Sequence, residues 1–217
     1  MAKQAQQAVV SERSLTIKAP NFKVASFHLI GESPLVIHRM SEKYRRDQRT
    51  KITTGKPAGC KKDRVPQQPE EIYQAAKYTS KEGWEGFQAS AVRNACISAC
   101  RLVGFKMTLA KLSIFVLPDG WDKDEPQIPL IRIIGKPIMQ EDVVRMADGT
   151  PNLTWRPAYH DWQAKVRIRW DADQFTIDDV ANLLSRVGMQ VGIGEGRPDS
   201  KNSAGMGWGL FCLGEKE

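Results

Sequence analysis

Positive charge in this sequence is concentrated in one run, residues 39–64. The run holds ten Lys or Arg residues against three acidic residues, a net charge of +7. The whole chain has 32 basic and 25 acidic residues, also a net of +7, so the remainder is balanced at 22 against 22. Ten clustered cations repel one another unless a polyanion relieves the repulsion, so phosphates are the expected partners. The candidate phosphate contacts in the run are Arg39, Lys43, Arg45, Arg46, Arg49, Lys51, Lys61 and Lys62.

The same run contains Gly55, Pro57 and Gly59 and few large apolar groups, so it cannot bury a core of its own. We predict an exposed, mobile excursion from the fold, an insertion at residues 39–68. A surface loop that only improves solubility is the alternative interpretation, and it needs no ligand.

A second cationic group lies in residues 164–170, where apolar and basic residues alternate strictly. In a strand, successive side chains point to opposite faces of the sheet. One face presents Lys165, Arg167 and Arg169, which predicts a basic sheet face. The residues predicted to face inward are Ala164, Val166, Ile168 and Trp170.

Residues 192–209 form a glycine-rich loop that contains Arg197 and Lys201. A dinucleotide-binding loop requires a helix directly after the glycines, which Pro198 and its polar neighbours prevent, and the lysine of a P-loop is missing. We therefore expect no nucleotide cofactor. The loop is either a flexible hairpin between strands or a close approach to a phosphate backbone, with Arg93 nearby. Its glycines are Gly192, Gly194, Gly196, Gly205, Gly207 and Gly209.

Residues 154–162 interleave aromatic rings with Arg156 and His160. Single-strand binding proteins use such pairs because every base has a π face that stacks on an aromatic side chain. Trp155, Tyr159 and Trp162 are therefore candidate stacking residues. Packing in the core or against another subunit is the competing interpretation.

The histidines His28, His38 and His160 are scattered, and no Ser, His and acid spacing identifies a catalytic triad. His38 stands where a strand meets the basic run and could act as a general base on a ribose hydroxyl; in an alternative, enzymatic interpretation either His38 or His160 supplies the acid-base chemistry. The cysteines show no zinc-binding spacing, so buried thiols are expected and metal binding is the minority interpretation. They are Cys60, Cys96, Cys100 and Cys212.

The remaining pattern predicts elements that would position these side chains. A long strand in 22–38 breaks at Gly31 and Pro34, and a short helix begins at Pro69. A helix over 87–104, with Ser90 as N-cap and Gly104 as terminator, precedes a strand at 111–117. After the basic strand, a helix capped by Thr176 and Asp179 ends at Gly188, followed by a strand at 189–194. Shorter strands are expected at 130–134 and 143–146.

This order of elements predicts an α+β fold, with a ferredoxin-like or RRM-like antiparallel sheet and helices on one face. Residues 1–20 are polar and aperiodic and are expected to form a flexible arm, which leaves 21–217 as a single domain. No apolar stretch reaches the roughly 20 residues of a membrane helix, and the N-terminus does not resemble a secretory signal. A cytoplasmic protein is therefore expected.

Three of these features, in this order, resemble the RAMP superfamily, the RRM-like subunits that form the backbone of CRISPR effector complexes. They are the opening strand with its turn at residues 27–37, the segment 86–99 with Arg93 at the basic position, and the glycine-rich loop before the last strand, 192–211. The resemblance covers about residues 22–213. It implies that the insertion at 39–64 contacts nucleic acid or an adjacent subunit. The chain also resembles proteins of bacteriophage genomes, which suggests a stand-alone, phage-encoded relative.

The leading hypothesis is sequence-independent binding of single-stranded RNA or DNA, with homo-oligomeric assembly along the strand and no membrane partner. One alternative is a metal-independent endoribonuclease of the same fold. Another is a phage structural or anti-defence interaction protein.

Overall fold

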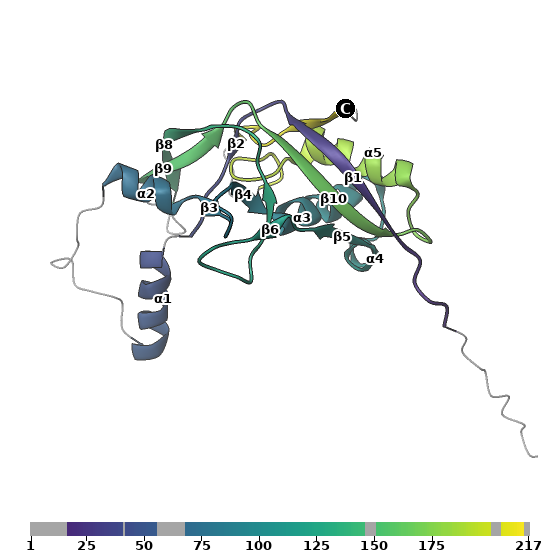
Figure 1. Cartoon of the computed structure of the whole chain (residues 1–217), viewed down its shortest axis with the longest axis horizontal. Coiled ribbons are helices and arrows are strands. Elements are labelled where there is room, and N and C mark those ends of the chain that lie inside the picture. The colour runs from purple at the N-terminus through teal and green to yellow at the C-terminus, as the bar shows by residue number, and fades with distance from the viewer. Residues whose placement is uncertain (1–16, 41, 56–67, 146–150, 201–204, 215–217) are drawn as a thin grey trace, which may run out of the picture.

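The computed structural model describes residues 17–40, 42–55, 68–145, 151–200 and 205–214. These residues form two four-stranded sheets and one three-stranded sheet (Figure 1). Every strand pair within the three sheets is antiparallel, and several helices accompany them. The α+β class expected from the sequence is therefore confirmed. The predicted arm at 1–20 lies mostly outside the described residues.

The main sheet has the strand order β11-β1-β10-β5. One of the helices that lie between β1 and β5 along the chain, and one that lies between β10 and β11, join the four strands of this sheet in the order β-α-β-β-α-β. The six elements are β1 (Phe22–Gly31), α3 (Ala89–Ala99), β5 (Ile114–Leu117), β10 (Gln163–Asp171), α5 (Ile177–Arg186) and β11 (Phe211–Gly214).

Strand β10 divides its side chains between core and surface as the alternation predicts. Its inward residues are at most 3% exposed and belong to the same core cluster as Val92 of α3 and Leu184 of α5. The inward set is Ala164, Val166, Ile168 and Trp170. Because the side-chain period of a strand is two, burying this set forces Lys165, Arg167 and Arg169 onto the opposite, exposed face.

Two smaller sheets complete the fold. The chain turns after β1, as Gly31 and Pro34 predict, and β2 pairs with β9, placing Leu35 opposite Tyr159. The three-stranded sheet contains β2 (Leu35–Val36), β8 (Pro137–Arg145) and β9 (Pro151–Tyr159), so the expected strand at 143–146 is the end of a longer one. The other sheet contains β3 (Tyr78–Thr79), β4 (Glu85–Gln88), β6 (Gly120–Trp121) and β7 (Pro129–Arg132).

The basic run is not an irregular excursion where the structure describes it. Residues Glu42–Thr54 form helix α1, and the segment 56–67 lies outside the described residues. The glycines and prolines of the run all follow residue 54, so the part before them contains no helix breaker. The prediction failed because it averaged two segments of different composition.

The helices before β5 follow the prediction in part. Helix α2 (Pro69–Ala75) begins at the expected proline. Helix α3 has Gln88 rather than Ser90 at its N-cap, and it continues as the 3-10 helix η2 (Cys100–Val103) to Gly104, whose φ of 69° ends it as expected. Helix α4 (Met107–Ser113) occupies the start of the segment predicted to be a strand.

Helix α5 has the predicted capping box between Thr176 and Asp179. It does not stop at Gly188, because the π-helix η3 (Val187–Val191) continues it, so the strand predicted at 189–194 is wrong. Gly188 serves a different purpose. A Cβ there would lie 1.9 Å from the carbonyl oxygen of Phe211, so glycine lets η3 pack directly on β11.

Candidate nucleic-acid interface

The outer face of the main sheet carries a row of cations on β10. In the pairing register, Lys165 lies opposite His28 on β1, and Arg169 lies opposite Phe115 on β5. Since β10 is an inner strand of this sheet, its exposed cations lie between neighbouring strands rather than at an edge. The basic sheet face predicted from the alternation is therefore present.

Two phenylalanines lie beside this row. The ring centroids of Phe22 and Phe115 are 5.7 Å apart, with an interplanar angle of 73°. The guanidinium carbon of Arg169 is 5.1 Å from the Phe22 centroid and 4.9 Å from that of Phe115. Phe22 is 39% exposed and Phe115 is half-buried, so this cluster offers both a ring face and a cation at the surface.

Arg93 of α3 reaches the same cluster at the edge of the sheet. Its guanidinium carbon lies 5.3 Å from the Phe115 centroid, and its Nε donates a hydrogen bond to the carbonyl of Ile114 at 2.9 Å. A further bond from Nη2 goes to the carbonyl of Lys111. These bonds hold the guanidinium against the ring, so Arg93 supports Phe115 and keeps its charge near the cation row.

The cations of the row differ in how many polar partners the protein itself provides for them. Arg167 donates to the carbonyl of Pro118 at 2.5 Å and lies 3.8 Å from a carboxylate oxygen of Asp119. Within the described ranges, the ammonium group of Lys165 contacts no polar partner and Arg169 forms no ion pair. No described carboxylate therefore neutralises Lys165 or Arg169, and both side chains can meet an external anion.

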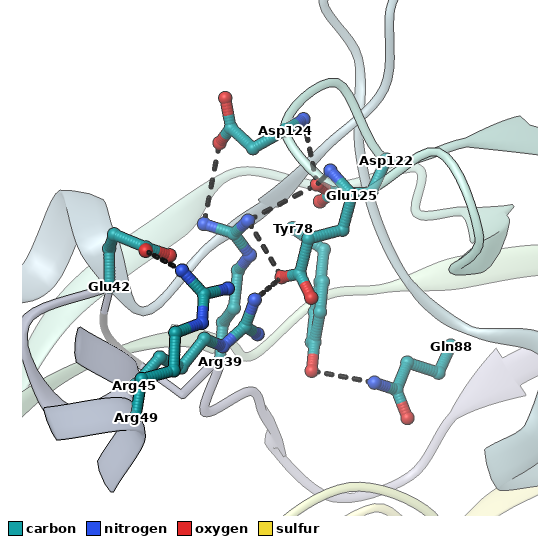
Figure 2. A network of polar contacts seen from close by, with 9 residues as sticks. All are labelled: Arg39, Glu42, Arg45, Arg49, Tyr78, Gln88, Asp122, Asp124 and Glu125. Carbon is teal, nitrogen blue, oxygen red and sulfur yellow. Dashed lines mark hydrogen bonds and ion pairs between the residues drawn. The ribbon is translucent and has the colours of Figure 1, made fainter. Parts of the chain in front are cut away.

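Arg39 and Arg45, predicted to bind phosphate, are instead neutralised within the protein. Figure 2 shows the guanidinium of Arg39 among the carboxylates of Asp122, Asp124 and Glu125, at 3.2, 3.4 and 2.9 Å. Arg45 of α1 pairs with the same Glu125. These ion pairs attach the start of α1 to the loop after β6, so Arg39 and Arg45 are engaged within the protein, and phosphate binding by them stays a prediction.

The rest of the run remains at the surface of α1 or outside the described part. Arg49 lies 3.3 Å from Glu42, with both side chains mostly exposed, and Arg46 and Lys51 are exposed without an ion pair to the described residues. Of Lys43 the structure describes only the backbone, and Lys61 and Lys62 lie outside the described residues. In Figure 1, α1 lies at one end of the molecule, away from β1, β10 and β5, so the described cations form separate groups rather than one surface.

Two of the three predicted stacking residues belong to the core. Tyr159 and Trp162 are each 1% exposed. The Tyr159 hydroxyl donates to Glu85 at 2.5 Å, and the Trp162 indole donates to the carbonyl of Ser33 at 2.9 Å. Desolvation and then the Glu85 carboxylate raise the pKa of Tyr159 far above its ordinary value. Neither ring can meet a base, and only Trp155 remains half-exposed.

The aromatic rings beside the cation row that sequence reasoning missed are those of Phe22 and Phe115. Both belonged to segments recognised as strands, yet neither segment alone shows which of its faces is solvent-exposed. The missing information was the register that brings them together across β10. Matching the outward positions of 164–170 to those of the other strands would have found them.

The glycine-rich loop uses many of its amide groups inside the protein. The N–H of Ile193 donates to the carbonyl of Gly209 at 3.0 Å, and the N–H of Glu195 donates to that of Val36 at 2.9 Å. Arg197 donates to the carbonyl of Gly194 at 2.9 Å. Residues 201–204, with Lys201, lie outside the described residues. The described part of the loop packs against β2 instead of presenting a row of open amides.

This loop forms one wall of a cavity of about 490 Å³, which His38 also lines. His38 is exposed at the cavity mouth, yet desolvation by the surrounding wall lowers its pKa below 6.5, with Glu195 raising it and Arg156 lowering it to smaller extents. His160 is exposed after β9. When the register of β2 with β9 is extended, His160 lies four residue positions from His38, about 13 Å along the strands. The two histidines therefore lie at separate places, and each stays a separate candidate for acid-base chemistry.

The cysteines Cys96 and Cys100 are buried free thiols, as predicted, and burial raises the pKa of Cys96 to about 12. Cys212 is half-buried, and Cys60 lies outside the described residues. In the described part of the chain, no three His, Cys, Asp or Glu side chains gather as metal ligands. None of the described helices is both long and apolar enough to cross a membrane.

No protein-family model and no curated protein sequence matches this chain. Among solved structures, it is similar to a chain in the cryo-EM structure of the type III-B Cmr-beta complex bound to cognate target RNA. The TM-score is 0.43 and the identity 11%; the match covers 90% of this chain and 60% of the other. The present chain thus spans 60% of that neighbour's length. The resemblance to the RAMP superfamily stays a prediction.

Proposed function

We propose that this protein binds single-stranded nucleic acid, without reading its sequence, on the outer face of the sheet β11-β1-β10-β5. We assign that sheet, with α3 and α5, to a ferredoxin-like, RRM-like arrangement. The assignment is supported by the β-α-β-β-α-β chain order and by a strand order in which the first and third strands of the unit are central. In such a sheet, one face packs on the helices and the other is available to a ligand.

The observation that carries the proposal is the position of Arg169 beside two phenyl rings on an exposed sheet face. Phe22 and Phe115 would each stack a base, and the guanidinium of Arg169 would stack beside them or meet a phosphate. Lys165 and Arg167, four and two residues earlier on the same face, would bind successive phosphates. None of these groups reads a particular base edge, so binding would be largely independent of sequence.

Binding is tested by fluorescence anisotropy with labelled single-stranded RNA and DNA of about 20 nucleotides and mixed sequence. Each phosphate contact to a single strand contributes about 0.7 to the slope of log affinity against log salt. The variant Lys165→Gln/Arg167→Gln/Arg169→Gln should therefore flatten the slope by about 2. A matched control, Lys81→Gln/Lys106→Gln/Lys123→Gln, removes the same charge from exposed lysines on other elements and should change the slope far less. Equal effects of the two triple variants would refute the sheet-face site.

The stacking part of the proposal has its own variant. Phe22→Leu keeps an apolar, partly exposed side chain but removes the ring, so affinity should fall about tenfold or more while the salt slope is unchanged. Arg169→Lys keeps the charge and removes the planar guanidinium, and it should behave in the same way. A change in slope with either variant would mean that the rings do not stack bases.

Side-by-side assembly along the strand remains a prediction of the resemblance. Sedimentation of complexes with strands of increasing length tests it, because assembly predicts a stepwise increase in bound protein. The interaction-protein alternative predicts that neither RNA nor DNA changes in anisotropy at any salt concentration.

The endoribonuclease alternative depends on His38 or His160; burial lowers the pKa of His38, which favours the neutral imidazole that can accept a proton. Incubation with labelled RNA in EDTA tests it. Cleavage by the native protein that disappears in His38→Ala and persists in His160→Ala would favour this alternative over binding alone.

A further inference from the structure

The cavity of about 490 Å³ lies apart from the sheet face and shares no residue with the proposed strand-binding site. Its walls come from the end of β2 and the segment after it, from β3 and β4, from one side of α3 along most of its length, from α4, and from the end of η3 and the loop after it. Its volume falls within the range of small-molecule sites in proteins. The cavity therefore offers room for one small ligand.

The charges facing the cavity favour an anion. Asp199 is paired with Arg101 and accepts a hydrogen bond from Ser98, and Glu195 lies 3.8 Å from Arg156. Arg101 and Arg156 do not line the cavity, so each of these two carboxylates is paired with a cation from outside the wall. By contrast, the two cations of the wall, Lys111 and Arg197, form no ion pair with the described residues.

Helix α3 adds to this positive field. It is 11 residues long, and no side chain caps its N-terminus at Gln88. Ser90 and Asn94 of its first turns line the cavity. The uncapped N–H groups and the positive end of the helix dipole both favour a negative group nearby. This end of the helix supports the choice of an anionic ligand, while the cavity and its unpaired cations carry the argument.

The remaining wall is suited to a flat, partly polar ring. The rings of Tyr78 and Phe87 border the cavity but are only 9% and 2% exposed; Met107 adds half-buried apolar surface, and the carboxamides of Gln88 and Asn94 contribute both donors and acceptors. The Gln88 amide donates to the Tyr78 hydroxyl at 2.7 Å, which fixes its orientation. The Asn94 side chain is exposed to the cavity and forms no hydrogen bond with the described residues. Apolar surface combined with oriented amides can hold a base by its face and its edge.

We propose that this cavity binds one mononucleotide, a nucleoside monophosphate, with the phosphate beside Lys111 and Arg197 and the base against the apolar and amide wall. The recognition would differ from that of the dinucleotide-binding and P-loop motifs, which the sequence lacks, because side chains rather than a glycine loop would hold the phosphate. The site extends beyond strand binding and does not require it.

Isothermal titration with AMP, CMP, GMP and UMP, with the corresponding nucleosides, and with inorganic phosphate tests this site on the full chain. We expect saturable binding of one monophosphate per protein, with weaker binding of the nucleoside and of phosphate alone. Lys111→Met should weaken binding about ten- to hundredfold through the loss of a charged hydrogen bond. Lys106→Met, an exposed lysine one turn earlier and outside the wall, is the matched control and should bind as the native protein does.

A second variant distinguishes the loss of a binding contact from a folding defect. Ser90→Phe places a ring at the cavity mouth without removing charge, and its folding is checked by circular dichroism and urea unfolding. Loss of binding in both Lys111→Met and Ser90→Phe would support the site. Binding that survives both, no monophosphate binding at all, or inorganic phosphate binding as tightly as a nucleotide would overturn it.

The strand-binding proposal can fail separately. The variant Lys165→Gln/Arg167→Gln/Arg169→Gln should lose RNA binding yet bind mononucleotides normally. Loss of both activities in that variant would contradict the independence of the cavity.

Discussion

Replacing Arg39 by methionine should destabilise the fold without changing the salt dependence of nucleic-acid binding. Methionine keeps an unbranched, flexible chain at this position but removes the guanidinium. The side chain of Asp122 is 1% exposed and would be left without its cation, although the N–H groups of Asp124 and Glu125 would still donate to it at 3.0 and 2.8 Å. The carboxylates of Asp124 and Glu125 reach water or Arg45 and would lose less.

The structure sets the expected magnitude. Removing one partner of a buried ion pair costs about 3–5 kcal/mol. The native pair is not fully satisfied, since Arg39 Nε and Asp122 Oδ2 have no hydrogen-bond partner among the described residues. We therefore expect the lower end, about 3 kcal/mol in the free energy of unfolding.

Urea unfolding measures this change, and Arg49→Met supplies the control. Arg49 and its partner Glu42 are 71% and 68% exposed, so breaking their pair should cost less than about 1 kcal/mol. Adding Asp122→Asn to Arg39→Met should recover part of the loss, because it removes the uncompensated charge. The reasoning is refuted if Arg39→Met costs no more than Arg49→Met, or if it flattens the salt slope of RNA binding as a phosphate contact would.

Three further changes test particular parts of the fold and the cavity. Gly209→Ala should lower the free energy of unfolding by about 3 kcal/mol, because φ is +71° and a Cβ would lie 1.8 Å from a carbonyl oxygen. Gly207 has a φ of +68° but open space around it, so Gly207→Ala should lower the same free energy by only about 1–2 kcal/mol. Thermal or urea unfolding measures both changes. Thr176→Ala removes the N-cap of α5 and should cost about 1 kcal/mol by urea unfolding, and an unchanged midpoint would contradict the capping box. In an NMR titration, the pKa of His38 should lie below 6.5. The Glu195 carboxylate raises this pKa, so Glu195→Gln should lower it further. An upward shift in that variant would contradict the attraction between Glu195 and His38.

Local signals predicted the parts of this protein that depend on neighbours in sequence. The alternation of 164–170, the capping box at Thr176 and the αL glycine at Gly104 all appear in the structure. Each depends on geometry within a few residues, a side-chain period of two or the dihedral angles of a helix end. The same reasoning failed at Gly188, because the need for glycine there comes from β11, which is distant in sequence.

The candidate site shows the same division. Charge density pointed to residues 39–64, yet Arg39 and Arg45 are held by carboxylates of a loop some 80 residues away in sequence. Aromatic spacing pointed to Tyr159 and Trp162, whose rings are core residues, because composition does not distinguish a stacking ring from a packing ring. In each case a contact between distant segments decided the outcome.

By itself, the sequence determined that the protein is α+β, that one strand presents three cations to solvent, and that two thiols are buried, because these follow from periodicity and from the preference of apolar groups for the interior. Only the tertiary structure decided which cations remain available and which rings accompany them. Strand register brings Phe22 and Phe115 to Arg169, and loop packing neutralises Arg39. Ion pairing and stacking act over a few ångströms between segments far apart in the chain, so they are fixed only when the chain folds.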